Sequence, residues 1–198
     1  MSIYKILKAG NPTLRQQSKP IAKFDRKIEK LIADLEETLK VQKDPVGVGL
    51  AAPQVGKLIR LFLAKIGPNS VIFINPEITW ASKATNDPPK KPKTRKLKTN
   101  DQETEKEYLM EGCLSLPHYY GPVQRQAEVK VTYETPKKIK NGKWKMENMT
   151  KSYKGLSAQI VQHEVDHLNG TLFIDRLFAQ NRKLYEQKGK EWIEVELP

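Results

Sequence analysis

The amino-acid sequence predicts an α+β fold in which antiparallel sheets surround a central helix. Three features support this prediction: a helical pattern of apolar residues after Asp25, apolar segments of strand length in the middle of the chain, and a second helical pattern from Gly155 to Leu168. Helices and strands can be separated because their apolar residues recur with periods of about 3.6 and 2. The strands precede and separate the helices without alternating regularly with them, which is typical of the α+β class.

Length and composition indicate one folded domain. The chain has 198 residues, of which 38% are hydrophobic and 29% are charged. This is enough apolar sequence for a core, and it excludes a wholly disordered chain. The amino-terminal residues contain no apolar signal segment, and no later stretch reaches the roughly 18 apolar residues of a membrane span. We therefore expect a single cytoplasmic domain over residues 1–198.

The single cysteine, Cys113, excludes an intramolecular disulfide and raises the question of what its thiol does. A lone thiol that has to stay reduced suits a reducing compartment. The formal net charge of +12 indicates attraction to polyanions, although such a charge bears on association and not on chemistry. The charge is therefore evidence about partners only.

The first expected helix follows Asp25, whose carboxylate can accept hydrogen bonds from the free amide groups of the first turn. Its apolar residues at helical spacing are Ile28, Leu31, Ile32, Leu35 and Leu39. This spacing predicts an amphipathic helix whose apolar face packs on the core.

The glycine-rich sequence GVGLAAPQVG at 47–56 predicts a loop. Two β-branched apolar segments, 58–66 and 71–78, flank a Gly-Pro-Asn turn and predict a hairpin. Residues 127–133 alternate as a strand does, and Asn141-Gly142 predicts a second tight turn. The middle of the chain is therefore expected to be mostly sheet.

Residues 83–107 interrupt this pattern. They include three prolines, eight Lys or Arg and five Asp or Glu, with Leu97 as the one large aliphatic side chain. Such a composition cannot supply a core element, so we expect a lysine-rich, flexible insertion. The small excess of cations favours a solvated loop over a dedicated RNA-binding arm.

The helical pattern from Gly155 to Leu168 should end at Asn169-Gly170, residue types that accept the left-handed conformation found at helix ends. Beyond it, residues 176–188 can form another surface helix closed by Gly189, followed by a short strand over 192–197. The helix that ends at residue 168 carries the most chemical information.

The sequence HEVDH at 163–167 lies on this helix and is typical of a metal site. Histidines four residues apart differ by about 40° in rotation and about 6 Å in height, so His163 and His167 can bind one ion. Glu164 projects beside the ion, where a carboxylate can take a proton from water and deliver it to a leaving group. The less specific interpretations are two histidines that merely share a helix face, or a closed structural zinc site.

A catalytic metal site needs a third protein ligand and an open position, and the residues alone leave the third ligand undecided. A downstream Glu186, Glu191 or Glu194 would complete the site of a zinc endopeptidase. Cys113, in EGCLS at 111–115, offers a thiolate that binds borderline divalent ions strongly, and Gly112 beside it allows close backbone approach. A lone cysteine is also common as plain core packing.

Three motifs, GVGLAAPQ at 47–54, EGCLS at 111–115 and HEVDH at 163–167, resemble the signature motifs of the peptide deformylases, in the same order. NPTLR near the start, the helix after Asp25 and the run QHEVDHLNGTLFIDRL also resemble that family. The resemblance implies the family's α+β fold. It also implies a metal-dependent hydrolase that removes the formyl group from the N-terminal methionine of newly made proteins and releases formate.

The resemblance further implies roles for single residues. The implied metal ligands are Cys113, His163 and His167. Glu164 would be the general acid and base, while Gln54 and the backbone amide of Leu114 would stabilise the charge on the formyl oxygen. The residues implied to border the substrate are Val48, Gly49, Leu50, Gly112 and Ile160. One divalent ion per chain is implied, Fe(II) in cells with Zn(II) or Ni(II) as substitutes.

Several residues and partners stay open. Asp166 and Gln162 flank the ligands and could orient them, or could simply be solvated helix residues. His118 follows EGCLS closely but is left out of the site. The expected partners are N-formylmethionyl nascent peptides, with electrostatic association with the ribosome as a hypothesis, and we expect a monomer. A basic binding module with a structural metal is an alternative, but it would need neither Glu164 nor Gln54.

Overall fold

The computed structural model describes residues 2–87, 109–139, 144–189 and 191–195. Its helices are α1 (Arg26–Lys40), α2 (Leu156–Leu168) and α3 (Phe173–Ala179), with the short 3-10 helices η1 (Pro12–Arg15) and η2 (Ala52–Val55). Its strands are β1 (Gly49–Ala51), β2 (Leu61–Ile66), β3 (Asn69–Ala81), β4 (Glu111–Cys113), β5 (Leu116–Gly121), β6 (Glu128–Lys138), β7 (Trp144–Lys154), β8 (Leu184–Lys188) and β9 (Glu191–Val195).

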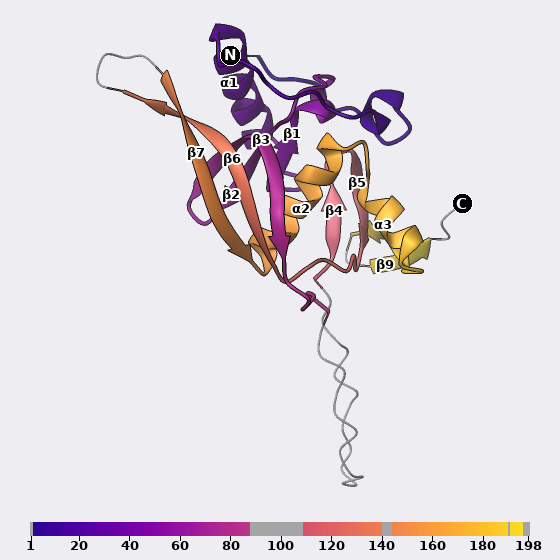
Figure 1. Ribbon diagram of the computed structural model, residues 1–198. Helices are drawn as coiled ribbons and strands as arrows, with labels where there is room; N and C mark the ends of the chain where they lie inside the picture. The colour runs from indigo at the N-terminus through magenta and orange to yellow at the C-terminus, as the bar shows by residue number, and fades with distance from the viewer. Residues whose placement is uncertain (1, 88–108, 140–143, 190, 196–198) are drawn as a thin grey trace, which may run out of the picture.

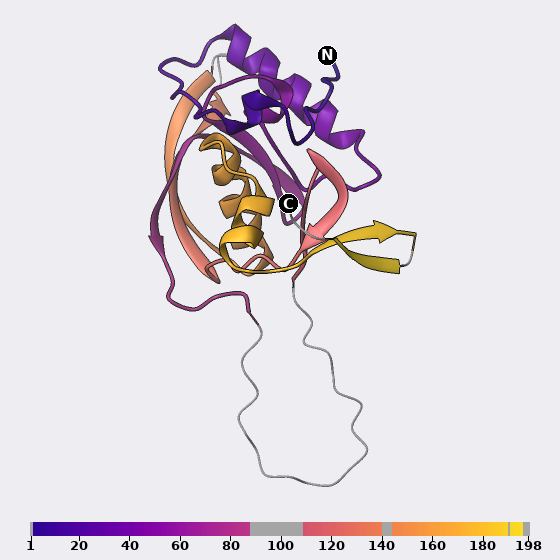
Figure 2. The same cartoon turned by 90° about the vertical axis from the view of Figure 1, so that its right-hand side faces the viewer.

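Both sheets are antiparallel. The larger sheet has the strand order β1-β2-β3-β6-β7, and the smaller sheet has the order β4-β5-β8-β9. In both views α2 lies between the β6–β7 pair and the β4–β5 pair (Figures 1 and 2), and it contacts β1, β2 and β7. The combination of antiparallel sheets with separate helices confirms the predicted α+β class.

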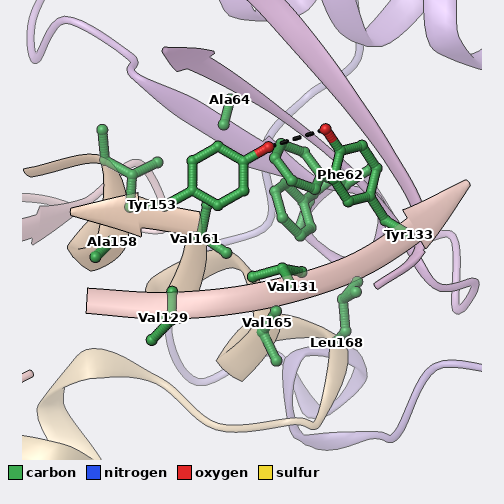
Figure 3. Packing of buried hydrophobic residues seen from close by; sticks show 13 residues of the cluster. Phe62, Ala64, Val129, Val131, Tyr133, Tyr153, Ala158, Val161, Val165 and Leu168 are labelled. Carbon is green, nitrogen blue, oxygen red and sulfur yellow. Dashed lines mark hydrogen bonds between the residues drawn. The ribbon is translucent and has the colours of Figure 1, made fainter. Parts of the chain in front are cut away.

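The larger sheet packs aromatic side chains against α2. Phe62 of β2 and Phe73 of β3 are fully buried, and their rings stack with centroids 4.3 Å apart. Tyr133 and Tyr153 join them, and their hydroxyl groups share a hydrogen bond of 2.9 Å (Figure 3). That bond satisfies two polar groups that burial would otherwise leave without partners. The aromatic cluster packs against apolar residues of α2 such as Val161 and so fixes the position of the helix on the sheet.

The apolar face of α1 forms a second core with β1 and β2, as its spacing predicts. The buried apolar residues of this face are Leu31, Ile32, Leu35 and Leu39. Because this core lies under the segment that follows residue 47, it supports one wall of the site described below.

Helix α1 begins where the sequence predicts, because Asp25 caps it. One carboxylate oxygen of Asp25 accepts hydrogen bonds from the backbone N–H groups of Lys27 and Ile28, at 2.9 and 3.0 Å. Replacing Asp25 by alanine is expected to lower the free energy of unfolding by about 1 kcal/mol, measured by urea denaturation. The control variant Asp25→Asn keeps an acceptor and should lose much less. Equal losses in the two variants would contradict the capping argument.

The glycine-rich segment is more regular than the loop that the sequence predicts over 47–56. Gly49–Ala51 forms β1, and Ala52–Val55 forms η2, which Gly56 ends in a left-handed conformation with φ +79°. Pairing with β2 makes the first part a strand, since the local residues show no strand pattern. The hairpin predicted after it is confirmed as β2 and β3.

Two further predicted features are confirmed. Helix α2 ends at Leu168, and Gly170 follows it with φ +73°. Strands β6 and β7 pair along their length as the second hairpin, although its predicted turn at Asn141-Gly142 lies outside the described residues. In the described part of the chain, no helix combines the length and the apolar character that crossing a membrane requires.

The helix predicted over 176–188 is confirmed only to Ala179, where α3 ends, and is wrong beyond it. The chain continues with a turn in which Asn181 has φ +50° and with strand β8. β8 pairs with β5, and β9 pairs with β8. All five residues of β8 pair with β9, and two of them also pair with β5. This strand pairing decides the conformation, and helical periodicity carries no information about it.

Residues 83–87, the first part of the predicted flexible insertion, are ordered against the body of the protein. Asn86 donates a side-chain hydrogen bond to the carbonyl oxygen of Val123 at 3.1 Å, and Thr85 forms an isolated β-bridge with Gln126. The first residues of the segment are therefore anchored to the body. Its remainder, 88–107, lies outside the described residues.

Candidate metal centre and adjoining cavity

Three potential metal ligands meet at one place. His163 and His167 lie one turn apart on α2, Cys113 ends β4, and all three side chains are buried. The Cys113 Sγ lies 3.2 Å from His167 Nε2, which lies 3.2 Å from His163 Nε2. The three ligand atoms fall within 4.8 Å of one another. The structure therefore brings together the three ligands that the resemblance implies.

The spacing of these atoms suits a divalent ion. Metal bonds of about 2.3 Å to sulfur and about 2.1 Å to nitrogen, arranged as a tetrahedron, separate neighbouring ligand atoms by roughly 3.5 Å. A thiolate with two imidazoles is a donor set for borderline ions. The residues present therefore fit a bound ion, and three protein ligands would leave one coordination position for water or substrate.

The surroundings of Cys113 favour its thiolate form. Burial opposes ionisation, but nearby His167 and hydrogen bonds from both histidines hold the pKa of the thiol well below its ordinary value. The backbone N–H of Ser115 also donates to the sulfur at 3.4 Å. The thiolate is the form of cysteine that binds metal ions.

A buried ion-pair network orients His163. Glu111 Oε1 lies 2.7 Å from His163 Nδ1, which leaves Nε2 to face the other ligands. Arg125 donates to both oxygens of Glu111, at 3.0 and 2.6 Å, and to Asp166 at 2.6 Å. Burial opposes the ionisation of Glu111, yet His163 and Arg125 lower its pKa to about 2. A carboxylate on the second ring nitrogen fixes the tautomer of a histidine ligand and strengthens it as a ligand.

Sequence reasoning missed Glu111 and Arg125. The one available signal was that Glu111 opens the EGCLS motif, two residues before Cys113. Asp166, considered as an orienting residue, instead accepts hydrogen bonds from Arg125 and Arg176. Gln162, considered with it, donates to two backbone carbonyl oxygens. None of these hydrogen bonds of Asp166 and Gln162 is made to Cys113, His163 or His167.

Glu164 lines the cavity beside the histidines. Its Oε2 atom is buried and has no hydrogen-bond partner among the described residues. Burial raises the pKa of Glu164 to about 7, against the attraction of His163 and His167. A carboxyl group that titrates near neutral pH and has a free oxygen can accept a proton and return it.

Gly49 makes room for that carboxylate. A side-chain carbon at position 49 would lie 2.1 Å from Glu164 Oε1, far closer than van der Waals contact. A glycine inside a strand often marks such a close approach. Strand β1 and helix α2 therefore meet at the expected proton carrier.

Three contacts orient the side-chain amide of Gln54. Its Oε1 accepts a hydrogen bond from the Ala51 N–H at 2.8 Å, while Nε2 donates to Ser115 Oγ at 3.1 Å and approaches Cys113 Sγ at 3.5 Å. Since the Ala51 N–H needs an acceptor, the amide oxygen must face it and the NH2 group must face the sulfur. The arrangement points a hydrogen-bond donor toward Cys113, one of the candidate ligands.

A cavity of about 290 Å³ is lined by two of the three candidate ligands, Cys113 and His163. The predicted site residues that line it are Val48, Gly49, Gln54, Gly112, Cys113, Leu114, Ile160, His163 and Glu164. Leu50 does not line it, because its side chain is fully buried in the core shared with α1. Neighbouring side chains in a strand point to opposite faces, so Gly49 faces the site and Leu50 faces away. The Leu50 side chain therefore does not contribute to the cavity wall.

The cavity has lining residues that sequence reasoning left out. His118 and Tyr120 of β5 contribute to one wall, and Pro45 and Val46 contribute to another. His118 Nδ1 lies 3.9 Å from a carboxylate oxygen of Asp44, and His118 is outside the group of converging ligand atoms. Its exclusion as a metal ligand agrees with this geometry.

The glutamates that would complete a zinc endopeptidase site lie on the β8–β9 hairpin. Glu186 pairs with Lys188 at 3.1 Å, and Glu194 pairs with Lys183 at 2.6 Å. Neither these residues nor Glu191 belongs to the group of ligand atoms around His163 and His167 in the described chain. The observed third candidate ligand is Cys113.

Comparisons with known proteins agree with this geometry. The chain matches the family model described as Polypeptide deformylase over residues 3–183. It is 36% identical over 186 residues to the peptide deformylase of Thermotoga petrophila, covering 94% of each chain. It is 37% identical over 196 residues to that of Brucella suis, covering 96% of this chain and 94% of the relative.

Solved structures show the same likeness. The crystal structure of peptide deformylase from Thermotoga maritima has a TM-score of 0.69 at 35% identity, covering 89% of this chain and 98% of that chain. A peptide deformylase from Synechococcus elongatus in complex with actinonin has a TM-score of 0.66 at 31% identity, covering 87% of this chain and 78% of that one.

Proposed function

The chain belongs to the polypeptide deformylase family, and from that membership we propose which residues bind the metal, transfer the proton, stabilise the oxyanion and contact the substrate. It is a metal-dependent hydrolase that removes the N-formyl group from nascent peptides. We assign Cys113, His163 and His167 as the metal ligands. The observation that supports this assignment best is the convergence of one favoured thiolate and two imidazole nitrogens beside a cavity.

Glu164 is proposed as the general acid and base. A bound divalent ion would act as a Lewis acid that lowers the pKa of water. The free Oε2 of Glu164 can accept a proton from the attacking water and deliver it to the departing amine. Its raised pKa, about 7, supports both directions of transfer near neutral pH.

Gln54 and the backbone amide of Leu114 are proposed to stabilise the developing oxyanion. The Gln54 NH2 group already faces the ligands because Ala51 holds its oxygen. Donors that are oriented before the reaction stabilise a transition state without a cost of reorganisation. Leu114 follows the Cys113 ligand directly and lines the cavity.

Val48, Gly49, Gly112 and Ile160 are proposed to border the formyl-methionine. They share the cavity wall with the proposed acid–base residue, and an apolar slot of this kind suits an unbranched, adaptable side chain. Leu50 is left out, since its side chain lies in the core.

The native ion is proposed to be Fe(II), with Zn(II) or Ni(II) as substitutes. A mixed sulfur and nitrogen donor set accommodates all three ions. Metal analysis of protein purified without oxygen tests this choice, and an excess of zinc in such a preparation would contradict it. Oxidation of the thiolate in air would remove a ligand.

We further propose a monomeric, single-domain cytoplasmic enzyme with α2 as its central helix. The burial of α2 from Ala158 to Leu168 supports the last point. The net charge of +12 supports electrostatic association with the ribosome, whose surface is polyanionic. Cosedimentation with ribosomes should weaken as salt rises, and binding that does not respond to salt would count against this partner.

The decisive experiment is hydrolysis of formyl-Met-Ala by protein loaded anaerobically with Fe(II), read as formate release. Formate production is expected, and its absence would refute the assignment. A Cys113→Ala variant is expected to lose metal and activity, whereas Ser115→Ala, which alters a neighbouring residue, should keep the metal. Full occupancy and activity in Cys113→Ala would favour a different third ligand.

Gly49→Ala is expected to lower kcat/KM by about 100-fold, because the added carbon displaces the Glu164 carboxylate by an ångström or more. The metal content should stay unchanged, since position 49 supplies no ligand. Gly67→Ala is the control: its φ of +66° strains the β2–β3 turn, but the added carbon meets nothing within 4 Å and the turn is not part of the cavity wall, so activity should persist. Full activity of Gly49→Ala would show that Glu164 need not occupy its observed position.

A further inference from the structure

One face of the smaller sheet carries large side chains next to the active-site cavity. The strand register places Tyr120 opposite Gly112 on one side and opposite Tyr185 on the other. Residues paired across antiparallel strands lie on the same face. Two residues beyond Tyr185, the same face continues with Gln187 and its partner Trp192.

The opposite face of this sheet is covered at β5 and at the start of β8. Tyr119 and Leu184 point to that side, where they pack in a core with Phe173 and Leu177 of α3. The face that carries Tyr120 and Trp192 is therefore the one turned away from α3.

Tyr120 connects this face to the cavity. It lines the cavity, and its ring lies so close over Gly112 that a side-chain carbon there would be 2.5 Å from two ring atoms. The Trp192 ring stands edge-on to Tyr120, with centroids 5.2 Å apart and an interplanar angle of 67°. Trp192 is nevertheless 48% exposed, whereas tryptophan side chains are on average highly buried.

The hairpin that carries Trp192 lies beyond the family match. That match ends at residue 183, β8 begins at Leu184 and β9 begins at Glu191. Figure 2 shows the hairpin, in yellow, standing out from the body beside β5. The exposed indole therefore stands on a hairpin that lies next to the part of the chain matched by the family model.

We propose that Trp192 extends the substrate-binding surface and contacts formylated peptides from about their third residue onward. The inference rests on the proposed function, since it takes the cavity as the site of the formyl-methionine. An extended peptide advances about 3.3 Å per residue. A chain that leaves the cavity over Gly112 and Tyr120 would therefore reach Trp192 after two or three residues. The flat apolar ring can pack against aliphatic or aromatic side chains without selecting one sequence.

The test compares three formylated peptides with metal-loaded enzyme: formyl-Met-Ala, formyl-Met-Ala-Gly-Gly and formyl-Met-Ala-Phe-Leu. Trp192→Ala is expected to raise KM for the Phe-Leu peptide by about 3- to 10-fold. Its kcat should stay unchanged, because the contact is the same in ground and transition states. The KM values for the other two peptides should not change, and Trp192→Phe should restore most of the loss.

The matched control is Ile193→Ala on the opposite face of β9, where the residue is similarly exposed at 41%. It should alter none of the three KM values. Equal losses on all three peptides would make Trp192 a structural support for Tyr120 and overturn the proposal, as would an unchanged KM for the Phe-Leu peptide. Absence of formyl-Met-Ala turnover in the parent protein would instead refute the proposed function itself.

Discussion

Glutamine in place of Glu164 is expected to lower kcat for formyl-peptide hydrolysis by about 10²- to 10⁴-fold, because the amide can neither accept nor return the proton. The substitution preserves the shape of the side chain, so the metal should stay bound. Formate release at saturating substrate measures the loss, and metal analysis shows that the site is still loaded. The control is Glu186→Gln, which alters a hairpin carboxylate paired with Lys188 and should keep full activity. Full turnover by the metal-loaded Glu164→Gln variant would eliminate this mechanism.

The thermal stability of Glu164→Gln shows whether its loss of activity is catalytic or comes from misfolding. Burial raises the pKa of Glu164 from its ordinary value of 4.5 to about 7, so ionisation costs the native state free energy. Below pH 4.5 the group is protonated in both the folded and unfolded chains, and the cost grows between pH 4.5 and 7. Chelator-treated Glu164→Gln should therefore have a higher Tm than the parent at pH 8 and a similar Tm at pH 4. A lower Tm at pH 8 would contradict this interpretation of the buried carboxylate.

Methionine in place of Arg125 is expected to lower the free energy of unfolding by about 3–5 kcal/mol. Arg125 is only 4% exposed, and its removal leaves Glu111 and Asp166 buried without their shared countercharge. Urea denaturation measures the loss. Because Glu111 also holds His163, metal affinity should fall by about 10- to 100-fold, read by competition with a chelator.

Arg176→Met is the matched control for Arg125. Arg176 also pairs with Asp166, but its side chain is 46% exposed and Asp166 keeps Arg125. Exposed ion pairs contribute about 0–1 kcal/mol, so the expected loss is small and metal binding should not change. If the two variants lost similar free energies of unfolding, burial would not explain how much Arg125 contributes to stability.

Features with local causes were predictable from the sequence. Helix α1 follows from the spacing of its apolar residues and from the cap at Asp25, and α2 ends at the predicted Asn169-Gly170. His163 and His167 share a helix face because four residues make about one turn. The third ligand was open on the residues alone, and only the resemblance of EGCLS to a family motif pointed to Cys113.

Features with distant causes were not predictable. Residues 184–188 form a strand because β9 pairs with all of them and β5 with two of them, although the sequence favours a helix there. Leu50 belongs to the core because the register of β1 against β2 turns Gly49 toward Glu164 and Leu50 away. A shift of one residue in that register would reverse the two faces.

The sequence by itself determined which chemical groups are available to this protein. It places two histidines on one helix face with a carboxylate beside them, and it contains a lone thiol. The resemblance of three motifs to one family connects these groups. The tertiary structure alone decided which residues support that chemistry. Glu111 reaches His163 across 52 residues of chain, and Trp192 reaches Tyr120 through two strand pairings. The physical reason is that helix spacing and caps arise from hydrogen bonds between neighbours in the chain, whereas ion pairs and strand registers depend on which distant segments pack together.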